Sequence, residues 1–146
     1  MRVLVIVKAN AESEAGALPS PEYVVKMGDY NNELIAAGVM LDGGGLRASA
    51  AGARVHIVRG EAIVTDGPFA ETKELIGGYW IWQVRDLAEA IDWAKKAPTD
   101  GDRPFDLELR PFFEPEDFAG VASEEIIAQE QDWRDEQARH APRATA

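Results

Sequence analysis

The segment at residues 79–84, YWIWQV, constrains the fold more than any other part of the chain. Its aromatic and β-branched residues are typical of a strand, and the alternation of a strand puts Trp80 and Trp82 on one face. A second run, residues 3–7, contains only Val, Leu and Ile. We predict that residues 3–7 form a central strand, and because both runs are apolar, the sheet must be covered on both sides.

Helix signals follow each of these two strands. Ser20 precedes a proline, which is the order of an N-cap and a first helical residue, and apolar residues then recur at steps of four and three until Gly38 ends the pattern. The second helix is expected to begin after Asp86, which forms a capping-box-like pair with Glu89, and to end at Pro98.

The remaining segments predict short strands, a hairpin and a tail helix. Residues 39–41 begin a short strand that runs into a glycine-rich loop at 42–45. Residues 53–65 predict a β-hairpin with an Arg-Gly turn, and residues 105–110 alternate as a half-buried last strand. A final helix over residues 123–137 carries few large apolar side chains, so it must lie on the body or on a partner chain.

The order of these elements predicts an α+β fold. A β-α-β unit, a hairpin and a second β-α-β unit suggest the ferredoxin-like split βαβ plan, an antiparallel sheet with two helices on one face. The other face would be a larger apolar patch than a monomer exposes, so we predict a homodimer. We expect this domain at residues 1–118 and a C-terminal helical extension at 119–146.

Composition narrows the classes of partner and site. The chain has 146 residues, with 26 acidic and 15 basic side chains and a net charge of −11. The excess of acidic residues and the lack of a basic cluster argue against nucleic acid or an anionic membrane surface as a partner. The absence of cysteine excludes thiolate metal sites and cysteine nucleophiles, and no metal-ligand spacing is found, so we predict no metal and no cofactor. The first apolar run is too short for a signal peptide, which favours a cytoplasmic protein.

The densest polar segment, residues 66–74 with the sequence DGPFAETKE, holds the candidate catalytic residues. In a pocket, Asp66 would accept a proton, Lys73 would stabilise developing negative charge, and Glu71 or Glu74 would tune either pKa or contact a substrate. The alternative is a charged surface turn in which Lys73 neutralises its neighbours.

Candidate binding residues lie outside this segment. Lys8 ends the first strand and Arg47 follows the glycine-rich stretch, so the two cations are candidates for holding an anionic group. Trp80 and Trp82 line a cavity or pack in the core. His56 is isolated in the hairpin, where packing is the favoured role.

The segment DGPFAETKE at 66–74, followed by the IGGYW stretch at 76–80, resembles the YCII-related or DGPF domain family. The first strand ending in Lys8, the step at residues 38–41 and the RPFFE segment at 110–114 resemble it as well. The resemblance covers about residues 1–118 and implies a ferredoxin-like domain that pairs into a dimeric α/β barrel.

The resemblance implies less about the reaction. One branch of the family has a His–Asp pair in a cleft as its proposed active site, but here the first helix has Met27 and Tyr30 where that histidine is expected. Only Asp66 therefore carries over as a candidate acid or base. The DGPF branch is often encoded beside extracytoplasmic-function sigma factors, which suggests a regulatory or stress context.

Two functions remain open at this point. The first is a small-molecule-binding protein or enzyme with a pocket at the DGPF segment and Asp66 as acid or base, its ligand a small anion or carbonyl compound. The second is a non-catalytic dimeric module that binds a partner protein through the acidic tail helix.

Overall fold

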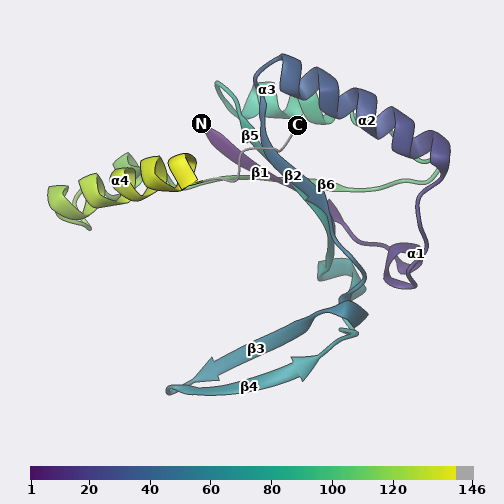
Figure 1. The fold of residues 1–146 in the computed structure, drawn as a ribbon, viewed down its shortest axis with the longest axis horizontal. Helices are drawn as coiled ribbons and strands as arrows, with labels where there is room; N and C mark the ends of the chain where they lie inside the picture. Colours follow the sequence, from purple (N-terminus) through teal and green to yellow (C-terminus); the bar gives the residue numbers. More distant parts are fainter. Residues whose placement is uncertain (141–146) are drawn as a thin grey trace. The chain divides into compact units, whose positions relative to one another are not determined.

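The computed structural model describes residues 1–140, apart from the side chain of Thr72 (Figure 1). Within them the backbone contacts separate a unit at Met1–Pro111 from a second unit that begins at Phe112. The two units are described one after the other.

The first unit is built on a four-stranded antiparallel sheet with the order β2-β5-β1-β6. The strands are β1 (Arg2–Lys8), β2 (Met40–Gly45), β5 (Ile76–Gln83) and β6 (Leu107–Pro111). The run predicted as a central strand, β1, does lie in the middle of the sheet, and the second apolar run, β5, lies beside it. Two apolar strands are thereby paired on both edges, and their backbone groups are satisfied within the sheet.

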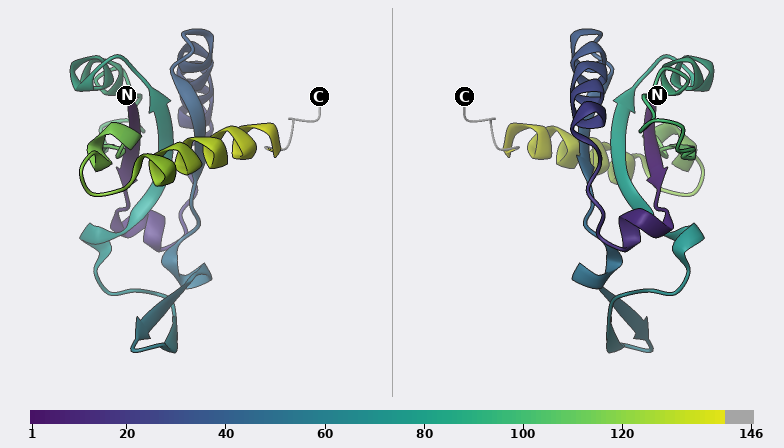
Figure 2. Two further views of the ribbon diagram at one scale, coloured as in Figure 1. Left: turned by 90° about the vertical axis from the view of Figure 1, so that its left-hand side faces the viewer. Right: turned by 90° about the vertical axis from the view of Figure 1, so that its right-hand side faces the viewer.

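Two helices cover one face of this sheet, α2 (Pro21–Ala36) and α3 (Leu87–Ala94), and Figures 1 and 2 show them on the same side. Side chains from both helices enter a single core with alternate residues of β1 and β5, which confirms the predicted α+β arrangement. The fully buried centre of this core consists of Trp82, Leu34, Val3 and Val5.

The predicted N-caps of both helices and the C-terminal glycine of α2 are confirmed, whereas α3 ends at Ala94 and not at Pro98. The Ser20 hydroxyl accepts the N–H of Tyr23 at 3.2 Å, and Gly38 adopts a φ of +70° one residue beyond the C-cap of α2. Asp86 caps α3 by accepting the N–H of Glu89 at 2.9 Å. The capping box is incomplete, because the Glu89 carboxylate accepts the N–H of the preceding residue, at position 85, and not that of Asp86.

The prediction of a glycine-rich loop at 42–45 is wrong, because these residues continue strand β2. The reason is the bulk of the neighbouring strand. A Cβ atom built on Gly43 would lie 2.7 Å from Cδ1 of Trp80, its partner across the sheet. On the facing strand, a Cβ atom at Gly78 would lie 3.0 Å from the carbonyl oxygen of Gly44. Glycine here permits close approach of two strands and does not mark a turn.

The predicted hairpin is present as β3 (Ala53–Val58) and β4 (Glu61–Asp66), which form a separate two-stranded sheet. Its turn has two consecutive left-handed residues, Arg59 at a φ of 50° and Gly60 at 83°. This matches the primed turns that suit the twist of a hairpin. Every residue of both strands is exposed within the described chain.

The sequence did not predict the short helix α1 (Ala11–Glu14), which lies between β1 and α2. It is held by a capping box between Asn10 and Ser13, with the Ser13 N–H donating to the Asn10 side chain at 2.9 Å. Two single-turn helices, η1 (Ser49–Ala51) and η2 (Thr72–Glu74), flank the hairpin along the chain.

The second unit contains a short helix, η3 (Pro115–Phe118), and a longer one, α4 (Glu124–His140). The predicted cap Ser123 accepts the N–H of Ile126 at 3.4 Å, and the helix runs three residues beyond the predicted end at Gln137. Arg134 joins α4 to Glu114 with an ion pair of 3.1 Å. Within residues 1–140, no helix is both long and apolar enough to cross a membrane.

Candidate functional site

A cavity of about 1030 Å³ lies beside the helix-covered face of the sheet in the first unit. It is lined by residues of β2, β5 and α2, by the N-terminal segment around α1, and by the loop that precedes β6. A volume of this size is at the upper end of the range found for small-molecule sites.

Apolar side chains form much of the cavity wall. Met27 of α2, Met40 of β2 and Trp80 of β5 line it, together with Leu46 and Phe105 from the loops. Trp80 is only 5% exposed, because its ring also packs edge-on against Tyr30 with the ring centroids 6.0 Å apart. The wall therefore combines one rigid aromatic residue with flexible methionines that can adapt to different ligand shapes.

Asn31 of α2 is a polar residue in this wall. The indole N–H of Trp80 donates to Oδ1 of Asn31 at 2.9 Å. Since an indole nitrogen is only a donor, this bond fixes which end of the amide is the oxygen. The amide nitrogen is then the group that Asn31 can offer to a ligand as a donor.

Most charged side chains at the cavity already have a partner of opposite charge. Lys8 Nζ lies 2.8 Å from Glu108, and Arg103 lies 2.8 Å from Glu12. Arg47 is different, since it is exposed and makes no ion pair or hydrogen bond with the described part of the chain. The cavity therefore has one positive group at its rim that is available for a ligand.

Asp100 and Tyr23 complete the polar lining at the start of α2. Asp100 accepts the Ser20 hydroxyl at 2.6 Å, and this hydrogen bond holds the pKa of the carboxyl below its ordinary value. Burial, and then the charge of Asp100, raise the pKa of Tyr23. Near neutral pH the Tyr23 phenol is thus protonated and can donate a hydrogen bond, while Asp100 is charged.

Three of the predicted binding residues, Lys8, Arg47 and Trp80, meet at this cavity. They come from β1, the segment after β2, and β5. Trp82 points to the same face of the sheet as Trp80, but it is completely buried in the core and does not line the cavity. Its indole N–H has no hydrogen-bond partner in the described chain.

The predicted catalytic segment lies apart from the cavity lining. Asp66 ends β4, and Glu71, Lys73 and Glu74 follow it in the segment that leads to β5, all four of them exposed. Glu71 pairs with Arg54 at 3.2 Å. The pKa of its carboxyl is lowered by its own backbone N–H and then by Arg54. None of these four residues belongs to the cavity lining at which Lys8, Arg47 and Trp80 meet.

The same segment is tied to the cavity wall through Ser49. The N–H of Phe69 donates to the Ser49 hydroxyl at 3.0 Å, and that hydroxyl donates to the Glu14 carboxylate at 2.5 Å. A Cβ atom at Gly67 would overlap the carbonyl oxygen of Ser49. The Gly-Pro-Phe part of the motif therefore packs on the backbone of η1, whose residues Ala50 and Ala51 line the cavity.

Sequence reasoning missed Asn31 and Tyr23 as site residues. Tyr23, Met27 and Asn31 are spaced four residues apart on α2, so they lie on one helix face, and all three line the cavity. A polar residue, Asn31, on the same helix face as Tyr23 and Met27 was the signal in the sequence that could have indicated the site.

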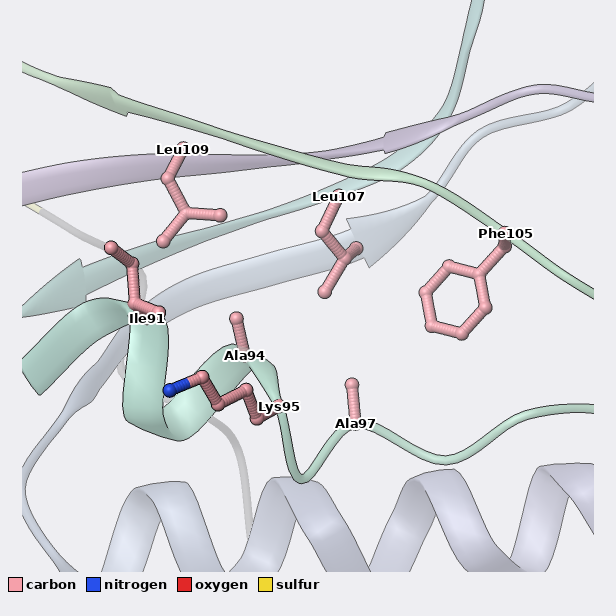
Figure 3. A pocket seen from close by; sticks show the side chains of 7 residues that line it. All are labelled: Ile91, Ala94, Lys95, Ala97, Phe105, Leu107 and Leu109. Carbon is pink, nitrogen blue, oxygen red and sulfur yellow. The ribbon is translucent and has the colours of Figure 1, made fainter. Parts of the chain in front are cut away.

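A second, smaller hollow of about 340 Å³ lies between α3 and the edge strand β6 (Figure 3). Ile91 and Ala94 face it from α3, Leu107 and Leu109 from β6, and Lys95 contributes the one charged side chain of its lining. This groove offers apolar surface without the set of hydrogen-bond donors found in the larger cavity. Among the described residues, no cluster of side chains that could hold a metal ion is found at either place.

Comparison with known proteins connects the first unit to one family. The family model for the YCII-related domain matches residues 1–104, which include the whole lining of the larger cavity except Phe105. An uncharacterized protein of Rhizobium meliloti (strain 1021) is 42% identical over 52 residues. That match spans 36% of this chain and 42% of the length of the relative.

Proposed function

The chain belongs to the YCII-related domain family, and from that premise we propose that it binds a small molecule in the cavity beside α2. The observation that carries the proposal is the combination of size and lining. About 1030 Å³ of space is bounded by apolar side chains and by hydrogen-bond donors that include Asn31, Tyr23 and Arg47. Concave, mainly apolar walls with a few placed polar groups are the usual form of a ligand site.

Catalysis by the DGPF segment stays a prediction. Asp66 as acid or base, with Glu71 and Lys73 as its partners, would act at the root of the hairpin and not inside the cavity. The two carboxylates of the lining, Glu12 and Asp100, are engaged by Arg103 and Ser20. Binding is therefore the function that the geometry supports best.

The test of ligand binding is to fill the cavity from strand β2. Gly45 lines the cavity, and a Cβ atom placed on it meets no atom within 4 Å. A Cβ atom built on Gly43, two residues earlier, would point at Trp80. Because side chains alternate along a strand, a side chain at Gly45 would point to the same face. Gly45→Leu should weaken binding of apolar probe ligands by about tenfold or more, which corresponds to about 1.4 kcal/mol, measured by isothermal titration calorimetry.

Gly28→Leu is the matched control. Gly28 is an exposed residue of α2 outside the cavity lining, and a Cβ atom placed on it meets no atom within 4 Å. Probe binding should be unchanged in this variant. Equal affinities in Gly45→Leu and the wild type would place the ligand elsewhere and contradict the proposal.

We also propose that two copies of the chain pair through the uncovered face of the sheet. Leu4 and Ile81 are partners across β1 and β5, and Ile6 pairs with Tyr79. These residues alternate with the buried core residues, so their side chains point away from the helices. An apolar sheet face of this kind favours a self-complementary contact with a second copy.

An interaction role for α4 is the second candidate function. Ile126 and Trp133 are seven residues apart, lie on one side of the helix, and are each 53% exposed. No residue of α4 is buried in the described chain. This apolar stripe on an otherwise acidic helix supports contact with a partner protein, as an alternative to a role in ligand binding.

A further inference from the structure

The charges around the larger cavity favour an anionic ligand. Of the cations that line it, Lys8 is paired with Glu108 and Arg103 with Glu12, while Arg47 has neither an ion pair nor a hydrogen bond within residues 1–140. Of the three basic side chains in the lining, Arg47 is therefore the one that no carboxylate of the described chain engages. A guanidinium matches one carboxylate with two parallel hydrogen bonds.

The distance between Arg47 and Trp80 determines how long a ligand must be to reach both. Trp80 is paired with Gly43, and Arg47 follows Gly43 by four residues along nearly extended chain. The N–H of Leu46 still donates to Gly77 at 2.9 Å, so the pairing with the neighbouring strand continues almost to Arg47. At roughly 3.3 Å per residue, the backbone of Arg47 lies up to about 13 Å from that of Gly43, the partner of Trp80.

The wall between these ends is apolar and adaptable. Met27 and Met40 line the cavity near Trp80, and Leu46 lies next to Arg47 in the sequence. Thioether side chains adjust to an extended, flexible ligand at small cost, whereas a compact polar metabolite would leave this surface without contacts. The amide nitrogen of Asn31 is a single polar point within it.

We propose that the ligand of the cavity is an elongated apolar monocarboxylate, whose carboxylate binds Arg47 and whose apolar body extends over Met27 and Met40 toward Trp80. This inference rests on the proposed function and specifies its ligand class. One unengaged guanidinium balances the single charge of a carboxylate, and a dianion such as a phosphate monoester would remain half-neutralised.

The experiment compares two probes of the same shape, decanoate and its neutral amide, decanamide, on the full chain by isothermal titration calorimetry. The wild type should bind decanoate about tenfold more tightly than decanamide, a difference of about 1.4 kcal/mol. Arg47→Gln should remove this preference and leave the affinity for decanamide unchanged. Acetate, which has the charge without the apolar body, should bind at least about a hundredfold more weakly than decanoate, since most of its contacts are missing.

Arg59→Gln is the matched control, because it removes the same charge from the exposed turn of the hairpin, outside the cavity lining. It should keep the full preference for decanoate. If Arg59→Gln lowers the preference as much as Arg47→Gln does, the effect comes from the net charge of the chain and the inference is wrong.

The two probes and Gly45→Leu give different results if the ligand class is wrong than if the cavity binds no ligand. If decanoate and decanamide bind equally, and Gly45→Leu weakens both, the cavity binds a ligand but Arg47 does not select a carboxylate. If neither probe binds, or Gly45→Leu affects neither, the proposal of a ligand cavity is itself contradicted. Acetate binding as tightly as decanoate would show that the apolar wall has no part in recognition.

Discussion

At Gly43, strand β2 has no room for a side chain. A Cβ atom there would lie 2.7 Å from Cδ1 of Trp80, 2.9 Å from Cε of Met40 and 3.1 Å from the carbonyl oxygen of Tyr79. Two of these neighbours are large side chains in or beside the core, and the third is backbone. Because Trp80 is held by its hydrogen bond to Asn31 and by Tyr30, it has little freedom to retreat.

Gly43→Ala should therefore lower the free energy of unfolding by about 1–3 kcal/mol, the usual cost of overpacking. Urea denaturation monitored by tryptophan fluorescence measures this change. Gly44→Ala is the control, since its Cβ atom would meet only Cε1 of Tyr79 at 3.9 Å, and it should change stability by less than about 0.5 kcal/mol. Similar losses in both variants would show that strand glycines matter for backbone reasons alone.

Single residues were predicted from the sequence where local rules decide their environment. The alternation of a strand placed Trp80 and Trp82 on one face, and both are buried in the core. Three consecutive glycines were interpreted as a loop, because the sequence does not show that residues 43 and 80 become neighbours. Asn31 was missed for the same reason, since its value depends on a tryptophan 49 residues away.

At the scale of elements, the start of α2 joins a helix cap to a distant loop. The Ser20 hydroxyl accepts the N–H of Tyr23 and donates to Asp100 at 2.6 Å, and the Ser20 N–H donates to the same carboxylate at 3.3 Å. The Ser20 contacts hold the pKa of Asp100 below its ordinary value. A lowered folded-state pKa contributes stability above the ordinary carboxyl pKa, and this stability is lost as the pH falls through the lowered value.

Ser20→Ala should lower the free energy of unfolding by about 1 kcal/mol through the lost cap. The part of the loss that comes from Asp100 should be present above about pH 4 and should shrink at more acidic pH. Urea unfolding of wild type and variant over this range measures both effects. In an Asp100→Asn background the Ser20→Ala loss should not change with pH; a persisting pH dependence would assign it to another group.

Elements with strong local signals were predicted, and elements held by tertiary contacts were not. A few adjacent residues determine the caps of α2 and α3 and the turn of the hairpin. Helix α1 has only four residues, too few for a periodic pattern. The cavity draws its lining from segments between Val7 and Phe105, so no local pattern indicates it.

At the scale of the whole molecule, the proposed pairing of two copies depends on the face of the sheet that α2 and α3 do not cover. Its centre is formed by Leu4, Ile6 and Ile81, which point away from the helices. We expect sedimentation velocity at micromolar concentration to give twice the 15.9 kDa mass of the chain. Ile81→Lys should shift the protein to the monomer, because it places a charge within this apolar contact.

Val24→Lys is the control for this experiment, since Val24 lies on α2 and is already 55% exposed. It should leave the association unchanged. A monomeric wild type, or a dimer that persists in Ile81→Lys, would contradict pairing through this face.

The exposed hairpin has a consequence for the colloidal behaviour of the protein. A ribbon of two strands presents a free edge on each side, and its middle pairs Val55 with Val64 and His56 with Ile63. Such edges promote strand-to-strand association unless something keeps the chains apart. The net charge of −11 supplies that repulsion over the whole molecule. It vanishes near the isoelectric point of about 4.6, where precipitation should begin at the hairpin.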